Sequence, residues 1–101
     1  MRIYHIVLAD DWAAWDTDLY RARSLEVEGF IHCSFENQLD SVIDRYYKGA
    51  SEIVVLEIET DALMSRTVNE PSTANEIYPH IYGPVNRDAI VSVERRKLAR
   101  K

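Results

Sequence analysis

Hydrophobic residues recur with a period of two in several short stretches of the chain, which is the pattern of β-strands. The stretch 51–59 is apolar on both faces in its middle, so we expect it to be a central strand. Gly29, a residue type that commonly ends a helical turn, precedes the apolar stretch 30–35. Strands are predicted at residues 2–8, 30–35, 51–59, 67–70 and 89–94.

The helical period is clear in one segment, residues 36–48. Shorter helical turns are predicted at 12–15, at 25–28 with Ser24 as the N-cap, and at 60–66 with Met64 turned inward. A regular alternation of strands and helices is absent, as are the glycine-rich Rossmann and P-loop motifs. We therefore predict an α+β fold, with small, mixed or mostly antiparallel sheets and one main helix.

Charge is distributed unevenly along the 101 residues, whose formal net charge is −5. Five of the 12 basic residues lie in the last seven positions, so residues 1–94 carry 7 basic and 17 acidic residues. Such a body repels a phosphate backbone, which makes nucleic acid an unlikely partner. The length suits a single domain. We predict this domain at residues 1–94 and a solvated basic C-terminal tail at residues 95–101.

The chain has one cysteine, and it has no apolar run near the roughly 20 residues that cross a bilayer. No basic segment followed by a long apolar one marks a signal peptide at the N-terminus. We therefore expect a cytoplasmic protein that does not bind membranes. The sequence does not indicate an oligomeric state.

All three histidines of the chain, His5, His32 and His80, lie among apolar residues. A single histidine of this kind is more often a hydrogen-bonded core residue than a catalyst. Three of them raise the prospect of one shared pocket. No local metal-binding motif is present, so no metal is expected, and a tri-histidine site could arise only through the fold. Cys33 leaves the strand on the face opposite His32, so a Cys–His pair is not expected.

Other candidate residues differ in how specific their signal is. Ser34 is predicted to share the strand face of His32. Arg21 and Arg23 precede that strand in a predicted loop and could clamp a phosphate. Glu70 ends a predicted strand beside the polar segment 72–76, the best candidate for a mobile loop. Tyr82, like Tyr20, could stack on a planar ring or pack in the core.

The chain is identified as a member of an uncharacterised bacterial family, domain of unknown function 952. The longest matching motifs are Glu-Gly-Phe-Ile-His-Cys-Ser at 28–34 and Pro-His-Ile-Tyr-Gly-Pro at 79–84. Further matches lie at residues 3–6, 24–25, 38, 42, 45–47 and 54–58. The resemblance runs through most of the chain in order, and the basic tail lies outside it.

That family resembles the ADP-ribosyltransferases, in which two small sheets flank an NAD cleft. The resemblance implies that His5 matches a basic residue that helps to hold the dinucleotide, and that His32 or Ser34 lines the nicotinamide pocket. The RNA 2′-phosphotransferases are similar in having histidines at these two positions. The best-known transferases also use a late catalytic glutamate whose position the resemblance does not assign in this chain, and the late motif offers His80 and Tyr82 instead. Protein ADP-ribosylation is therefore less expected.

The leading hypothesis is a protein that binds NAD or a related nucleotide in a cleft around His5, His32 and His80, and that could act as a transferase on it. The candidate catalytic residues are His32, His80 and Glu70. The candidate cofactor-binding residues are His5, Arg21, Arg23, Ser34 and Tyr82. Three alternatives remain open: a non-catalytic module for an ADP-ribose-like ligand, a tri-histidine metal-assisted hydrolase, and three motifs that only build the core.

Overall fold

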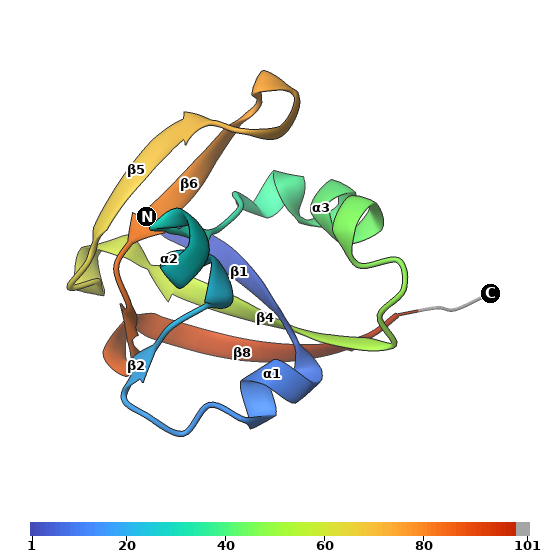
Figure 1. Ribbon diagram of the computed structural model, residues 1–101, viewed down its shortest axis with the longest axis horizontal. Coiled ribbons are helices and arrows are strands. Elements are labelled where there is room, and N and C mark those ends of the chain that lie inside the picture. Colours follow the sequence, from blue (N-terminus) through green and yellow to red (C-terminus); the bar gives the residue numbers. More distant parts are fainter. Residues whose placement is uncertain (99–101) are drawn as a thin grey trace.

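The computed structural model describes residues 1–98, which form small antiparallel sheets with one principal helix packed to one side (Figure 1). The first sheet has the order β1-β4-β8 and the second has the order β3-β6-β5. Strands β2 and β7 form a separate pair. The bounds are β1 Arg2–Leu8, β2 Leu19–Tyr20, β3 Ile31–His32, β4 Glu52–Glu59, β5 Arg66–Pro71, β6 Ile77–Tyr82, β7 Val85–Asn86 and β8 Ile90–Lys97. The predicted α+β class with antiparallel sheets is confirmed.

Strand β4 is central in the first sheet, as its uninterrupted apolar run predicts. Alternate side chains enter two cores, because Val54 and Leu56 belong to one buried cluster while Ile53 and Val55 belong to the other. Helix α3, Leu39–Tyr46, covers the second of these clusters with its apolar stripe. The predicted main helix is thus confirmed, with a short 3-10 turn over Glu36–Gln38 before it.

A single backbone bridge joins β1 to the segment that follows β3. The amide of Tyr4 donates to the carbonyl oxygen of Ser34 at 2.8 Å, and the amide of Ser34 donates to the carbonyl oxygen of Tyr4 at 2.7 Å. The predicted strand 30–35 is therefore shorter than expected, with a two-residue ladder and this bridge. The bridge holds the first sheet against the second.

The two short helices begin earlier than their sequence signals suggest. Helix α1 is Ala9–Ala13 and helix α2 is Arg23–Glu28. Ser24 lies inside α2 and is not its N-cap, which is Ala22. The predicted stop is confirmed, because Gly29 takes the left-handed conformation with φ of 89°.

Strand β6 was not predicted, because Pro79 lacks an amide donor and proline is rare in central strands. β6 nevertheless lies between β3 and β5. The carbonyl oxygen of Pro79 still accepts from the amide of Cys33 at 3.0 Å. The ladder between β3 and β6 has only two residue pairs, Ile31 with Ile81 and His32 with His80. The amide donor that Pro79 lacks falls beside this short ladder, so the sheet tolerates its loss. The inward placement of Met64 was wrong, since it is 80% exposed.

The boundary between domain and basic tail was also wrong. Strand β8 continues to Lys97 and pairs with β4 as far as Glu52. The amide of Leu98 donates to the carbonyl oxygen of Ser51 at 2.9 Å. The basic residues 95–97 thus belong to the sheet through their backbone pairing and not to a tail. Residues 99–101 of the predicted tail lie outside the described part of the chain. Within residues 1–98, no helix has the length and apolar character needed to traverse a bilayer.

Candidate functional site

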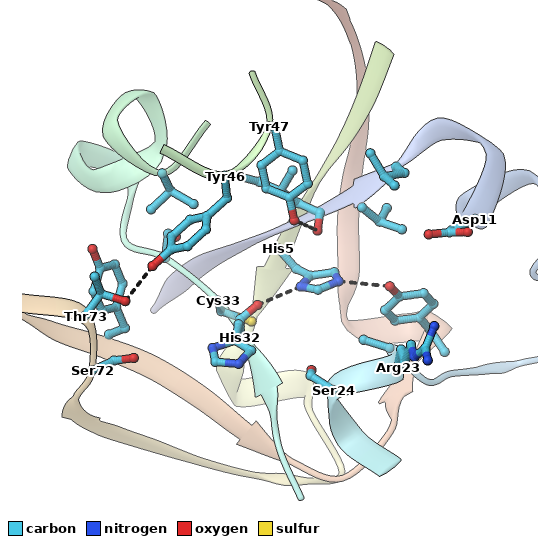
Figure 2. Close-up of a pocket in the computed structure, with 18 residues that line it drawn as sticks. His5, Asp11, Arg23, Ser24, His32, Cys33, Tyr46, Tyr47, Ser72 and Thr73 are labelled. Carbon is cyan, nitrogen blue, oxygen red and sulfur yellow. Dashed lines mark hydrogen bonds between the residues drawn. The ribbon is translucent and has the colours of Figure 1, made fainter. Parts of the chain in front are cut away.

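A pocket of about 470 Å³ opens between the first sheet, α3 and the segments around β3 (Figure 2). Its walls come from β1, α1, β2, the start of α2, the end of β3, α3 and the tip of the β5–β6 hairpin. The size lies within the range of small-molecule sites. Of the predicted site residues, His5, Arg23, His32 and Ser34 line it.

His5 is a buried, neutral crosslink in the pocket wall. Its Nδ1 lies 2.7 Å from the carbonyl oxygen of His32, which can only accept, so Nδ1 carries the proton. Its Nε2 then accepts from the Tyr20 hydroxyl at 2.9 Å. Burial lowers the pKa of His5 to about 4 despite the backbone hydrogen bond to His32. Both ring nitrogens are engaged, so His5 shapes the pocket and keeps no nitrogen for a ligand.

Tyr20 is held in place by an aromatic cluster on its far side. Its ring centroid lies 5.9 Å from that of Trp12 and 5.4 Å from that of Trp15. The Trp15 indole donates to the carbonyl oxygen of Leu19 at 3.2 Å, which fixes β2. Burial raises the pKa of the Tyr20 hydroxyl, so it stays a donor to His5. The two half-buried tryptophans therefore pack against the core and position the pocket wall.

His32 is the histidine whose side chain remains half-exposed at the pocket. Its Nε2 lies 2.9 Å from Oε2 of Glu28, the last residue of α2. The left-handed Gly29 turns the chain between these two residues. Ser34, two residues further, is buried and also lines the pocket. The predicted proximity of His32 and Ser34 is thus found, whereas the carboxylate partner of His32 had no sequence signal.

His80 and Glu70 do not line the pocket, although sequence reasoning placed them with His32. His80 is buried, and its Nδ1 lies 2.8 Å from Oε1 of Glu70. The Tyr82 hydroxyl donates to the same carboxylate oxygen. The ring of Phe30 stacks on that of His80 with centroids 4.1 Å apart. Phe30 therefore covers His80 on the face of the second sheet. The prediction of one cleft shared by all three histidines was wrong, because His80 does not line the pocket.

Of the two arginines predicted to bind a phosphate, Arg21 and Arg23, one lines the pocket. Both side chains are exposed, but Arg23 begins α2 and lines the pocket, whereas Arg21 lies outside it. Tyr82, another predicted cofactor contact, is outside it too. Several other lining residues were not predicted as site residues: Asp11, Ser24, Tyr46, Tyr47, Ser72, Thr73 and Tyr78. The polar tip of the hairpin was the one signal that could have pointed to Ser72 and Thr73.

The tri-histidine metal site is not formed. Among residues 1–98, no group of three or more His, Cys, Asp and Glu side chains could hold a metal ion. Both ring nitrogens of His5 are hydrogen-bonded to protein groups, and the ring of His80 is stacked against that of Phe30. His32 and His80 do approach, with ring centroids 5.3 Å apart. Two of the three histidines therefore meet, but without the geometry of a metal centre.

Cys33 is expected to be unreactive in the folded protein. Its thiol is buried, and burial raises its pKa, so little thiolate forms near neutral pH. Iodoacetamide at pH 8 should modify Cys33 at least roughly tenfold more slowly in buffer than in denaturing urea, as followed by mass spectrometry. Equal rates in both conditions would show that the thiol is accessible.

Family and structural comparisons place the fold among known proteins. Residues 6–93 match the family model described as "Protein of unknown function (DUF952)". The chain belongs to the DUF952 family. The crystal structure of protein CC0527 from Caulobacter crescentus is similar to this DUF952 chain, with a TM-score of 0.86 at 24% sequence identity. The match covers 98% of this chain and 89% of that one.

Two further structures of the same Caulobacter protein agree with this DUF952 fold. A crystal structure of a double mutant has a TM-score of 0.85 at 23% identity, covering 98% of this chain and 89% of that chain. A solution NMR structure has a TM-score of 0.75 at 23% identity, covering 97% and 86%. No curated protein matches the chain significantly. The comparisons therefore establish the family and the fold.

Proposed function

We propose that this DUF952 protein binds NAD or a related nucleotide in the pocket beside His32, on an ADP-ribosyltransferase-like fold. The observation that carries the proposal is the set of polar groups that the protein leaves unengaged around an aromatic-walled pocket. Arg23, Ser24 and Ser34 line it without a side-chain hydrogen bond to another residue within 1–98. A cation and hydroxyls are the groups that a phosphorylated ribose needs.

The tyrosine hydroxyls of the pocket wall are already engaged within the protein. The Tyr46 hydroxyl lies 2.6 Å from Oγ1 of Thr73, and the Tyr47 hydroxyl donates to the carbonyl oxygen of Ile6 at 3.3 Å. Tyr78 donates to Glu76 at 3.3 Å. These three tyrosines therefore offer a ligand mainly their ring faces. An aromatic wall of this kind suits a planar base or a nicotinamide ring.

Arg23 is the residue best suited to the phosphates. Among the described lining residues it is the sole lysine or arginine. Its guanidinium can give two parallel hydrogen bonds to phosphate oxygens. Ser24 follows it on α2, while His32 and Ser34 lie on the neighbouring wall. This arrangement supports pyrophosphate at the α2 side and ribose hydroxyls toward His32.

The pocket supports binding more directly than it supports transfer. Cleavage of the glycosidic bond in NAD passes through an oxocarbenium-like state, which a carboxylate close to the sugar stabilises. Glu70 is engaged by His80 and Tyr82 outside the pocket. His32, paired with Glu28, remains the candidate for proton transfer there. A non-catalytic nucleotide-binding module is therefore the second form of the same proposal.

The test compares two arginines that differ in position but not in charge. NAD is titrated into the wild type, Arg23→Ala and Arg21→Ala while amide and aromatic NMR signals are followed. We expect Arg23→Ala to weaken binding about tenfold or more, because a charge-assisted hydrogen bond is lost, and Arg21→Ala to change it less than about twofold.

The proposal fails if millimolar NAD moves no pocket signal of the wild type, or if both variants weaken binding equally. Incubation with NAD followed by product analysis then separates the two forms of the proposal. A product that requires His32 indicates transfer, and intact NAD after saturation indicates a binding module.

A further inference from the structure

Two side chains of opposite charge line the pocket without a partner. Asp11 on α1 and Arg23 on α2 lie toward the same end of it, away from Ser72 and Thr73 (Figure 2). Neither makes an ion pair or a side-chain hydrogen bond with another residue in the described part of the chain. Asp11 is the sole carboxylate among the lining residues of 1–98, as Arg23 is the sole permanent cation.

The negative charge of Asp11 acts on the interior of the pocket. The pKa of Tyr47 is raised by burial and, after that, by the charge of Asp11. The pKa of Tyr20 is raised by burial, then by Tyr47, and then by Asp11. Both tyrosines line the pocket, so a ligand near them would experience the same field.

This pair of charges is suited to a ligand that carries both signs. With His5 held neutral, Asp11 and Arg23 balance each other. A purely anionic ligand gains from Arg23 but is repelled by Asp11, whereas a ligand with a phosphate and a cationic ring satisfies both. Oxidised NAD has this combination in its pyrophosphate and its pyridinium ring. The reduced form and ADP-ribose keep the phosphates and lack the ring cation.

We propose that Asp11 makes the pocket selective for the oxidised, pyridinium-bearing form of the dinucleotide, an inference that rests on the nucleotide-binding function proposed above. Asp11 acts as a specificity-determining residue that pairs with the positive ring while Arg23 pairs with the phosphates. Because the site is open to solvent, one such charge contact corresponds to roughly three- to tenfold in affinity.

The experiment measures dissociation constants of oxidised NAD, reduced NAD and ADP-ribose by calorimetry at low salt. The proteins are the wild type, Asp11→Asn and Asp10→Asn. Asp10 is the matched control, since it neighbours Asp11 on α1, is exposed and does not line the pocket. We expect the wild type and Asp10→Asn to prefer oxidised NAD by roughly three- to tenfold over both other ligands. Asp11→Asn should reduce the preference over reduced NAD to about one, and Asp11→Glu should restore part of it.

The outcomes separate this inference from the function on which it rests. If all three ligands bind the wild type equally and Asp11→Asn changes nothing, the selectivity is refuted while nucleotide binding stands. If Asp10→Asn abolishes the preference as fully as Asp11→Asn, the pocket carboxylate is not its source. If none of the ligands binds, the nucleotide-binding proposal fails first. Added salt should shrink the preference, because the contact is electrostatic and exposed.

Discussion

Lowering the pH from 7 to 4 is expected to remove roughly 3 kcal/mol of folding stability through His5 alone. The pKa of His5 is about 4 in the folded protein, against 6.5 for an ordinary histidine. Between these values the unfolded chain takes up a proton that the folded chain does not. The contribution is therefore fully present above about pH 6.5, is lost as the pH falls toward 4, and changes no further below that.

Urea unfolding at a series of pH values checks this expectation. The matched variant is His5→Gln, which keeps a donor and an acceptor but does not titrate. The difference in unfolding free energy between wild type and variant should shrink as the pH falls from 6.5 to 4. Parallel curves for the two proteins would mean that His5 is not buried and neutral as described. Glu59, whose pKa is lowered from 4.5 to about 2 mainly by the N-terminal ammonium, titrates from about pH 4.5 downward, and its effect cancels in the difference because both proteins carry it.

Replacing Gln38 by alanine is expected to cost about 2–4 kcal/mol, although Gln38 is a single polar residue. Its amide nitrogen donates to Glu76 at 2.9 Å and to the carbonyl oxygen of Ile77 at 2.8 Å. Its amide oxygen accepts from the amide of Phe35 at 2.9 Å. Gln38 is buried, so its loss leaves backbone groups of two segments without partners.

The neighbour Asn37 supplies the control, because it is exposed and its side chain makes no hydrogen bond within residues 1–98. Asn37→Ala should change the unfolding free energy by less than about 0.5 kcal/mol. Hydrogen exchange should locate the damage of Gln38→Ala in the tip of the β5–β6 hairpin, which that side chain ties to the start of α3. Similar costs for both variants would show that the buried amide is not an anchor.

The sequence predicts those parts of the fold in which the apolar pattern is long and uninterrupted. The strand 52–59 has no polar interruption at its centre, and α3 has four apolar residues on one stripe, which Tyr47 continues at the C-cap. β6 was missed because Pro79 opposes the strand assignment locally, while pairing on both sides overrides it. The two residues of β2 are too few to carry a period.

The site was harder to predict, because whether a residue lines the pocket depends on which neighbours cover its side chain. His32 and His80 have similar apolar surroundings in the sequence and are paired directly across β3 and β6. Phe30 stacks on one of them and leaves the other half-exposed. Asp10 and Asp11 are adjacent residues of the same type, and the direction in which α1 turns decides that only Asp11 lines the pocket. Such differences arise from tertiary packing, which has no local signature.

The backbone bridge between Tyr4 and Ser34 has a consequence for cooperativity. It joins the two sheets close to the pocket, where the His5–His32 hydrogen bond makes a second connection. A ligand that contacts both walls adds a third link and binds the native state alone. By mass action, a free ligand concentration of a hundred times the dissociation constant adds about 2.7 kcal/mol to the free energy of unfolding. That stabilisation should be shared by both sheets, so that amides of β4 and β6 slow their exchange together on saturation.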